Sequence, residues 1–250
     1  MSQSERIVVH WLNYSRSQRI IWLLEELNIP FELKTYKRTK EFRAPLELDD
    51  VHPLGKSPVI EIIKPDGEKK VLAESGHIIQ YFLKHYDPNH ILTPTNPKEL
   101  EEMDYFLHYS EGSLNSLLVT LLVHQFAKQK APFGTRFLMG LLVKGIDDQF
   151  YLPELKKNLN FLENVLIKQK KELNSKYFVG NSLTGADIIL SFPILTNIFS
   201  SKDSAKALGV NDIEKRWPNL NEWSENIAKE PKFIKAKELV AEYDTITPNI

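Results

Sequence analysis

Hydroxyl side chains gather just ahead of the first amphipathic segment of the chain. Tyr14, Ser15 and Ser17 follow a short apolar run over residues 7–12 and precede a stretch with helical spacing. A hydroxyl at the start of a helix can cap the helix, or it can help the helix N-terminus to stabilise an anion. No triad pattern accompanies these residues, and a free serine is too weak an acid to act as a base, so acyl transfer is not indicated.

A second pair of polar residues, Glu74 and Ser75, opens a later segment with one apolar face. The carboxylate can pair with an ammonium group, while the serine hydroxyl and the free amides of the first turn can hold a carboxylate. An acidic residue at the start of a helix is also favourable by itself. Plain helix stabilisation is therefore the alternative interpretation of this pair.

Composition and spacing exclude several other chemistries. The chain has no cysteine, which rules out disulfides, thiolate metal sites and a redox centre of its own. Lys56 and Ser57 resemble the end of a phosphate-binding loop, but Asp50 stands where a glycine is needed and Pro58 replaces the start of a helix. The seven histidines are scattered without ligand spacing, so we expect no metal. Thiol chemistry would require a thiol supplied by a ligand.

Charge and hydropathy do not indicate a polymeric partner. Lys and Arg total 32 against 33 Asp and Glu, for a net charge of −1, so no global field attracts nucleic acid. The N-terminal residues lack the pattern of a secretion signal, and no stretch reaches the roughly 18 apolar residues of a membrane span. We expect a cytoplasmic protein with a small ligand, and we leave peripheral membrane attachment open.

Periodicity predicts the elements that position these residues. Residues 7–12 and 31–36 have the pattern of strands on either side of a helix, which makes a βαβ unit. Residues 58–63 and 69–72 predict an antiparallel hairpin, and a helix follows from Ser75. The proline-rich residues 88–97 separate this mixed sheet from the remainder, so the fold class is α/β followed by all-α. The predicted domains are 1–87, a linker over 88–97, and 98–250.

Only helical patterns appear beyond the linker. We predict helices over residues 99–129, over 134–173 with an interruption at Pro153, over 186–200, and two shorter ones after Trp217. Thr184 and Asp187 have the spacing of a capping box at the start of one of them. That motif is a folding signal without catalytic content.

Four segments carry a resemblance to the glutathione transferase family. They are residues 13–19, 52–58, 74–75 and 179–187, which lie in both halves and extend the resemblance over nearly the whole chain. The run SRSQRIIWLLEEL looks most like fungal and bacterial members with a serine at the active site. The resemblance implies a thioredoxin-like N-terminal domain that binds glutathione, an all-helical domain that holds the electrophile, and a homodimer.

The resemblance also implies a catalytic residue. Ser15 would donate a hydrogen bond to the glutathione sulfur, and Ser17 and Tyr14 are the local alternatives. Lowering the pKa of a thiol by about two units requires roughly 2.7 kcal/mol of preferential thiolate stabilisation. A hydroxyl donor and a helix N-terminus can share that task.

Further residues correspond to the family's ligands of glutathione. Ser57 precedes a cis-proline, Pro58, and would pair with the cysteinyl part through its main chain, although a branched apolar residue is usual there. Glu74 would bind the γ-glutamyl ammonium and Ser75 the neighbouring carboxylate. The expected ligands of the glycine carboxylate are Lys56 and Arg43.

The implied activity is conjugation of glutathione to hydrophobic electrophiles, with reduction of hydroperoxides as a second activity. We expect the electrophile against Tyr105, His108 and Tyr109, although core packing is the alternative for each. A non-catalytic glutathione-binding or regulatory module on the same fold is the other interpretation. A thiol-disulfide reductase is disfavoured because the chain has no cysteine.

Overall fold

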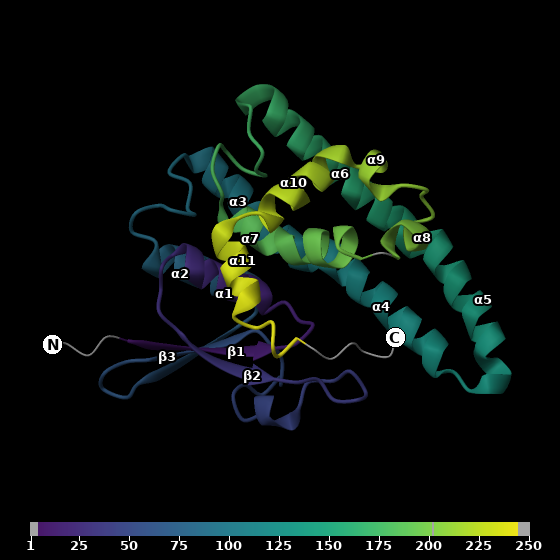
Figure 1. The fold of residues 1–250 in the computed structure, drawn as a ribbon, viewed down its shortest axis with the longest axis horizontal. Coiled ribbons are helices and arrows are strands. Elements are labelled where there is room, and N and C mark those ends of the chain that lie inside the picture. Colours follow the sequence, from purple (N-terminus) through teal and green to yellow (C-terminus); the bar gives the residue numbers. More distant parts are fainter. Residues whose placement is uncertain (1–4, 202, 245–250) are drawn as a thin grey trace.

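One mixed sheet lies beneath a stack of helices (Figure 1). The structure is a computed structural model that describes residues 5–201 and 203–244. The strands run in the order β2-β1-β3-β4, with β1 parallel to β2 and antiparallel to β3, and β3 antiparallel to β4. Their bounds are β1 Arg6–Leu12, β2 Glu32–Tyr36, β3 Val59–Ile63 and β4 Lys69–Ala73. The predicted βαβ unit and hairpin are therefore confirmed.

Strand register brings the polar segments to one end of the sheet. His10 of β1 lies opposite Val59 of β3, which lies opposite Ala73 of β4. The loop that leaves β1, the Ser57–Pro58 segment that enters β3 and the Glu74 position that follows β4 therefore share an edge. Neighbouring strands lie about 4.8 Å apart, so this edge spans roughly 10 Å from β1 to β4.

Two helices cover the upper face of the sheet. These are α1, Gln18–Glu26, and α2, Ser75–Tyr86, and both bury an apolar face against alternate residues of the strands. The last helix, α11, Pro231–Glu238, packs on α1, where the rings of Trp22 and Phe233 meet edge to face at 5.1 Å. The C-terminal part of the chain thus returns to the N-terminal domain.

Two long helical rods dominate the second half. The first consists of α3 (Pro97–Tyr109), a π-helical turn η2 (Ser110–Asn115) and α4 (Ser116–Lys130). The second consists of α5 (Arg136–Ile146), a π-helical turn η4 (Asp147–Tyr151) and α6 (Leu152–Leu173). Pro153 lies just after η4 within the continuous rod, where its missing N–H removes one hydrogen bond from the helix. The predicted interruption is thus a π-helical turn just before the proline rather than a break at it.

Shorter helices complete the fold. Among them α8 and α9 were not predicted, because five and four residues are too few to establish a period. No helix within residues 5–201 and 203–244 combines the length and the apolar character needed to cross a bilayer. The remaining elements are η1 Leu46–Leu48, η3 Phe133–Thr135, α7 Gly185–Ser191, η5 Phe192–Phe199, α8 Ser204–Leu208, α9 Ile213–Arg216 and α10 Pro218–Ala228.

The capping box at the start of α7 is confirmed. The Thr184 hydroxyl accepts from the amide of Ala186, while the Asp187 carboxylate accepts from the amide of Thr184 at 3.0 Å. Asp187 also accepts from the amide of Phe178 and the indole N–H of Trp223. Burial raises the pKa of Asp187 to about 6, although these donors oppose the rise. The motif therefore joins α10 to the start of α7.

Candidate functional site

The loop between β1 and α1 holds two serine hydroxyls in mutual contact. Ser15 Oγ donates to the carbonyl of Leu12 at 2.7 Å and lies 2.5 Å from Ser17 Oγ. Ser17 Oγ also lies 3.2 Å from the same carbonyl and accepts from the amide of Leu12. Ser17 is the N-cap residue of α1 but makes no side-chain capping bond. Both residues are buried, Ser15 with 8% of its surface exposed and Ser17 with none.

Tyr14 is held by the C-terminal part of the chain. Its backbone adopts a left-handed conformation with φ of 49°, which is uncommon for a tyrosine. Its hydroxyl donates to the carbonyl of Asp244 at 3.3 Å, and its amide donates to the Asp244 carboxylate. Burial and the Asp244 charge raise the pKa of Tyr14. The phenol is therefore directed to Asp244 rather than to the two serines.

Arg38 fastens this loop to the segment that follows β2. Its guanidinium donates to the carbonyls of Asn13, Tyr14 and Phe42, and its amide donates to the side chain of Asn13. The guanidinium also lies over the ring of Phe42 at 4.6 Å. Sequence reasoning did not identify Arg38, because the charged connection that contains it has no periodicity.

An ion-pair network joins α1 to the first rod. Arg16 and Arg19 both pair with the carboxylate of Glu111 in η2, and Asn115 donates to the same carboxylate. Arg19 is fully buried and also donates to the carbonyl of Ile189 at 2.5 Å. Burial alone would raise the pKa of Glu111, but the two guanidinium charges outweigh it and hold the pKa below its usual value. The network anchors the segment that follows Ser15 to η2, and the sequence offered no signal for it.

Ser57 and Pro58 lie at the same edge. Their peptide bond is cis, and Ser57 Oγ donates to the carbonyl of His10 at 2.8 Å. The Ser57 side chain is thus bound to the strand that leads to Ser15. Its main chain lies between the loop after β1 and the start of α2.

Glu74 occupies a strained position at the start of α2. Its φ and ψ of 68° and 118° are rare for a residue with a side chain, and such strain costs of order 1–3 kcal/mol. The Glu74 side chain is exposed, whereas Ser75 is buried. No side chain caps α2, so the amides of its first turn remain free to bind an anion.

The two expected ligands of the glycine carboxylate lie on the surface. Lys56 adjoins Ser57 in the chain and is exposed. Arg43 is exposed in the segment after β2, where its amide donates to the Thr39 hydroxyl and its carbonyl accepts from the Thr39 amide. Lys56 and Arg43 are therefore both accessible to a ligand.

The residues expected to line an electrophile pocket have their contacts elsewhere. Tyr109 donates to Asn158 of α6 at 2.6 Å, and Tyr105 stacks on Tyr109 with both rings against Phe161 of α6. Residues two apart in a helix point about 200° apart, so Tyr109 faces away from the side on which Glu111 meets the Ser15 loop. His108 is exposed beside Asp104.

A different aromatic group stands next to the Ser15 loop. Phe42 lies 6.3 Å from Tyr14 and 5.2 Å from Phe126 of α4, measured between ring centroids. These three side chains come from the β1–α1 loop, the segment after β2, and the second half of the first rod. Sequence reasoning missed Phe42 and Phe126, since no periodicity relates them.

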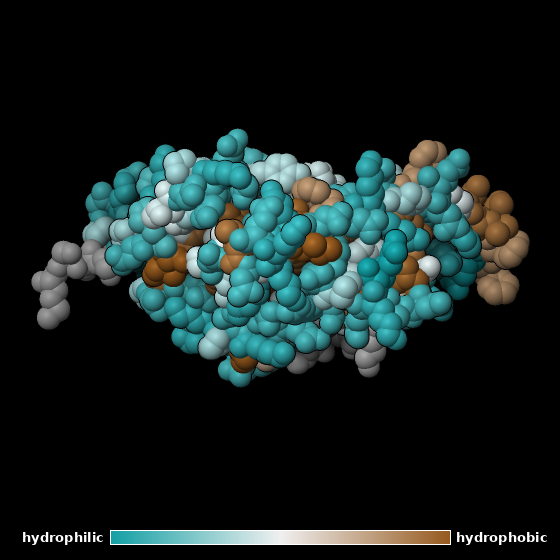
Figure 2. Space-filling view, turned by 90° about the horizontal axis from the view of Figure 1, so that it is seen from above, coloured by the Kyte–Doolittle hydropathy of each residue, from teal (hydrophilic) through white to brown (hydrophobic). Residues whose placement is uncertain are grey.

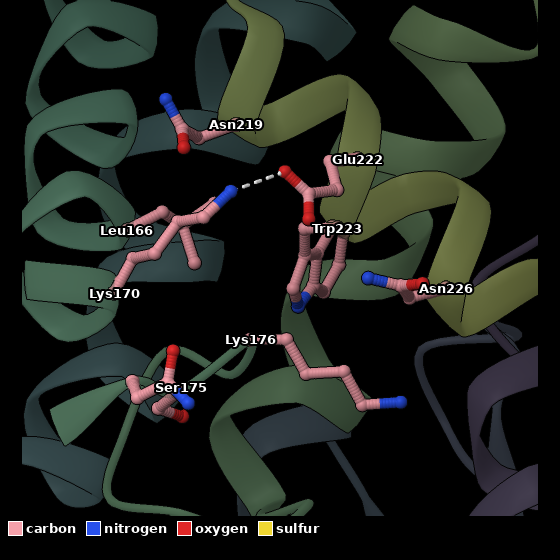
Figure 3. A pocket seen from close by; sticks show the side chains of 9 residues that line it. Leu166, Lys170, Ser175, Lys176, Asn219, Glu222, Trp223 and Asn226 are labelled. Carbon is pink, nitrogen blue, oxygen red and sulfur yellow. Dashed lines mark hydrogen bonds and ion pairs between the residues drawn. The ribbon is translucent and has the colours of Figure 1, made fainter.

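The hollow in Figure 3 lies far from these groups in the fold, between α6 and α10. It has a volume of about 140 Å³, and an ion pair between Lys170 and Glu222 at 2.8 Å crosses it. None of the predicted site residues lines it. Among residues 5–201 and 203–244, no group of three or more His, Asp or Glu side chains converges as a metal site.

Comparison with known proteins assigns both halves of the chain to one family. Residues 15–85 match the family described as Glutathione S-transferase, N-terminal domain, and residues 144–236 match Glutathione S-transferase, C-terminal domain. The chain is 36% identical to Glutathione S-transferase 1 of Saccharomyces cerevisiae, over 93% of this chain and 94% of the yeast protein.

Solved structures agree with this assignment. A glutathione S-transferase from Actinobacillus pleuropneumoniae superposes with a TM-score of 0.69 at 29% identity, covering 94% of this chain and 93% of the bacterial one. A glutathione transferase homolog from Lodderomyces elongisporus, solved with two glutathione molecules per subunit, superposes with a TM-score of 0.70 at 21% identity, covering 94% and 98%. The expected fold, a thioredoxin-like sheet followed by a helical domain, is confirmed.

Proposed function

Because this chain belongs to the glutathione S-transferase family, we propose that it binds glutathione at the sheet edge and conjugates the glutathione thiolate to hydrophobic electrophiles. The observation that carries the proposal is the convergence of three polar segments on that edge. The Ser15 loop, Ser57–Pro58 and Glu74–Ser75 meet there through the register of β1, β3 and β4.

The dimensions of the edge suit a tripeptide. An extended tripeptide spans about 10 Å, which is close to the two strand spacings between β1 and β4. Glu74 and the free amides of α2 would bind the γ-glutamyl end, Ser57 the cysteinyl unit through its main chain, and the sulfur would lie at Ser15. Exposed Lys56 and Arg43 would attract the glycine carboxylate.

Ser15 is the proposed donor to the thiolate. Ser17 is completely buried and Tyr14 is bonded to Asp244, whereas Ser15 keeps a small exposed fraction of 8%. When a thiolate arrives, the Ser15 proton turns from the carbonyl of Leu12 to the sulfur. Ser17 Oγ lies 3.2 Å from that carbonyl and can replace the lost bond, so no acceptor is left unpaired. Ser17 then acts as a positioning residue rather than as the donor.

The contacts of the aromatic residues shift the proposed electrophile site. Tyr14, Phe42 and Phe126 adjoin the Ser15 loop and form an apolar wall on which an aryl group can stack. Tyr109 is buried against α6, which supports assigning it to the core of the helical domain, and Tyr105 stacks on it at the surface with half of its area exposed. His108 stays a candidate at the margin of the site.

Further properties belong to the same proposal. A thiolate activated at Ser15 would also reduce hydroperoxides, which gives a second activity.

We propose the domain division 1–87, 88–97 and 98–250, a homodimer as the active species, and a cytoplasmic location. A stable 29.0 kDa species by sedimentation at micromolar concentration would contradict the homodimer.

The direct test is retention on immobilised glutathione followed by conjugation and hydroperoxide assays. Retention with turnover of an aryl halide supports the proposed transferase. Retention without turnover in either assay favours a non-catalytic glutathione-binding module. Failure to bind glutathione contradicts the site.

A further inference from the structure

Two ionisable side chains are buried on the side of the sheet that faces away from α1 and α2. Hydrophilic side chains cover most of the molecular face shown in Figure 2, as expected for charged groups that need water. His10 of β1 and Glu61 of β3 are exceptions, since they are only 1% and 6% exposed. Their sequence neighbours Val9 and Ile60 belong to the apolar core shared with α1 and α2, so alternation along each strand directs His10 and Glu61 to the other face.

The segment that follows β2 covers this other face. It passes beneath the sheet in Figure 1, on the side away from α1 and α2, and it contains η1. Leu48 of η1 is completely buried, and the charge of Glu47 acts on Tyr36 at the end of β2. The same segment carries Arg43 and Lys56, the proposed ligands of the glycine carboxylate. The buried face therefore adjoins residues that the proposed function assigns to glutathione.

His10 connects β1 to both neighbouring strands. Its Nδ1 lies 2.8 Å from the hydroxyl of Tyr36 in β2, and the two rings stack with centroids 5.7 Å apart. Its Nε2 lies 3.3 Å from Oε2 of Glu61 in β3, whose other oxygen accepts from Lys69 of β4 at 2.8 Å. The main-chain carbonyl of His10 accepts from Ser57 Oγ. One residue thus contacts β2, β3 and the segment that enters β3.

The surroundings of His10 favour a neutral ring. Burial lowers the pKa of His10 despite the neighbouring Glu61. The charges of Lys34 on β2 and Lys69 on β4 act in the same direction as burial. Burial alone would raise the pKa of Glu61, but Lys69 and His10 outweigh it, so this carboxylate stays ionised. The single ring proton then lies on Nε2, facing the carboxylate, and Nδ1 accepts from the hydroxyl of Tyr36.

Tyr36 connects this pair to the loop that leaves β1. Its carbonyl accepts from the amide of Asn13 at 3.3 Å, and the Asn13 side chain accepts from the amide of Arg38. Burial raises the pKa of Tyr36, so its hydroxyl stays protonated and can donate. The neutral imidazole thus fixes the end of β2 against the two segments that the proposed site requires, which are the loop after β1 and the Ser57 segment.

We propose that neutral His10 is a positioning residue for glutathione, which holds the end of β2 and the Ser57 segment in the geometry that the ligand requires. A second proton on Nδ1 would remove the acceptor for Tyr36 and add a charge near Lys34 and Lys69. Glutathione affinity would therefore fall as the pH falls below 6.5, the ordinary pKa of a histidine. This inference rests on the proposed glutathione site.

Calorimetric titration with S-methylglutathione tests the proposal on the full chain, because the sulfur of this ligand cannot ionise. His10→Phe keeps a ring but removes the acceptor, and it should weaken binding at least about tenfold at pH 7. Tyr36→Phe removes the donor of the same hydrogen bond and should weaken binding at least about fivefold. The double variant should lose no more affinity than His10→Phe alone, because both substitutions act through one contact.

His10→Asn supplies the rescue and the pH readout. Its amide oxygen can accept from Tyr36 at every pH, so the affinity at pH 7 should return to within about threefold of the wild type. Between pH 7 and pH 5 the wild type should lose at least about twofold more affinity than His10→Asn. Ile62→Val, buried in β3 on the core face, is the matched control, which should lower the melting temperature without changing the affinity.

The outcomes separate this role from the glutathione site itself. Wild-type binding with unchanged affinity in His10→Phe and Tyr36→Phe overturns the proposal, and if His10→Phe does not fold, Tyr36→Phe decides alone. Additive losses in the double variant, equal pH dependence of the wild type and His10→Asn, or an equal loss of affinity in Ile62→Val also overturn it. Failure of the wild type to bind S-methylglutathione contradicts the proposed glutathione site, and the role of His10 with it.

Discussion

The two halves of the first helical rod are used in opposite ways. The turn η2 holds Glu111 between two arginines, which binds it to the N-terminal domain by charge, and it buries Leu114. The following helix α4 buries no residue completely and leads into α5, which buries only Val143. One continuous helix can therefore hold the Ser15 loop at one end and leave apolar side chains exposed at the other.

Removing the Glu111 carboxylate is the most disruptive way to test this difference. Glu111→Ala leaves the buried guanidinium of Arg19 without its ion pair, and breaking a buried pair costs about 3–5 kcal/mol. Urea unfolding should show this loss. Glu101→Ala, an exposed carboxylate on α3, should change the free energy of unfolding by less than about 0.5 kcal/mol. Equal effects of the two substitutions would show that the ion pairs of Glu111 do not stabilise the fold.

Truncating one buried leucine of η2 and one exposed leucine of α5, which packs beside α4, sharpens the comparison. Leu114→Ala in η2 removes a fully buried side chain and should cost about 2–5 kcal/mol, because it leaves a cavity. Leu138→Ala on α5 removes an exposed side chain and should cost less than about 0.5 kcal/mol. Urea unfolding of both variants gives the measurement. A large loss of unfolding free energy in Leu138→Ala would mean that the exposed side of α5 is buried in solution.

Glu74→Ala separates ligand binding from stability. The variant removes the proposed partner of the γ-glutamyl ammonium and should weaken glutathione affinity by about 10–100-fold, in keeping with a charged hydrogen bond. Calorimetric titration measures the affinity. Glu68→Ala, at an exposed position in the β3–β4 turn, is the control and should leave the affinity unchanged. Unchanged affinity in Glu74→Ala would remove Glu74 from the site.

The pH dependence of stability gives a smaller and more specific effect. Glu111 has a lowered pKa in the folded state, whereas its ordinary value is 4.5. Its stabilising contribution is therefore complete above pH 4.5 and is lost as the pH falls through the lower folded value. In Glu111→Gln the free energy of unfolding should fall less steeply in that acidic range. An unchanged slope would show that the ion pairs do not hold this pKa down.

The strands and the site edge were predictable because their signals are local. Short apolar runs in 7–12 and 58–63 place two of the strands, and the position of Glu74 follows from the hairpin that joins 58–63 to 69–72. The capping box of Thr184 and Asp187 could likewise be recognised from four consecutive residues.

The contacts around the candidate site were not predictable, because they join distant parts of the chain. Glu111 lies 92 positions from Arg19, and Phe126 meets Phe42 across the two domains. Helical spacing placed Tyr105 and Tyr109 on a common face but could not say which neighbour that face meets, and they meet α6. The exposure of apolar side chains on α4 and α5 was not predicted either, since an apolar helix is normally expected to be buried.

The central claim is that Ser15 stabilises the glutathione thiolate, and the pKa of the bound thiol tests it most directly. Ultraviolet absorbance of the thiolate against pH should give a value about two units below the 8.5 of a free thiol in the wild type. Ser15→Ala should raise that value by at least about one unit, with glutathione still bound and conjugation slowed at least about fivefold. Ser15→Ala with bound glutathione and an unchanged thiol pKa would contradict the claim and return Ser17 and Tyr14 as candidates.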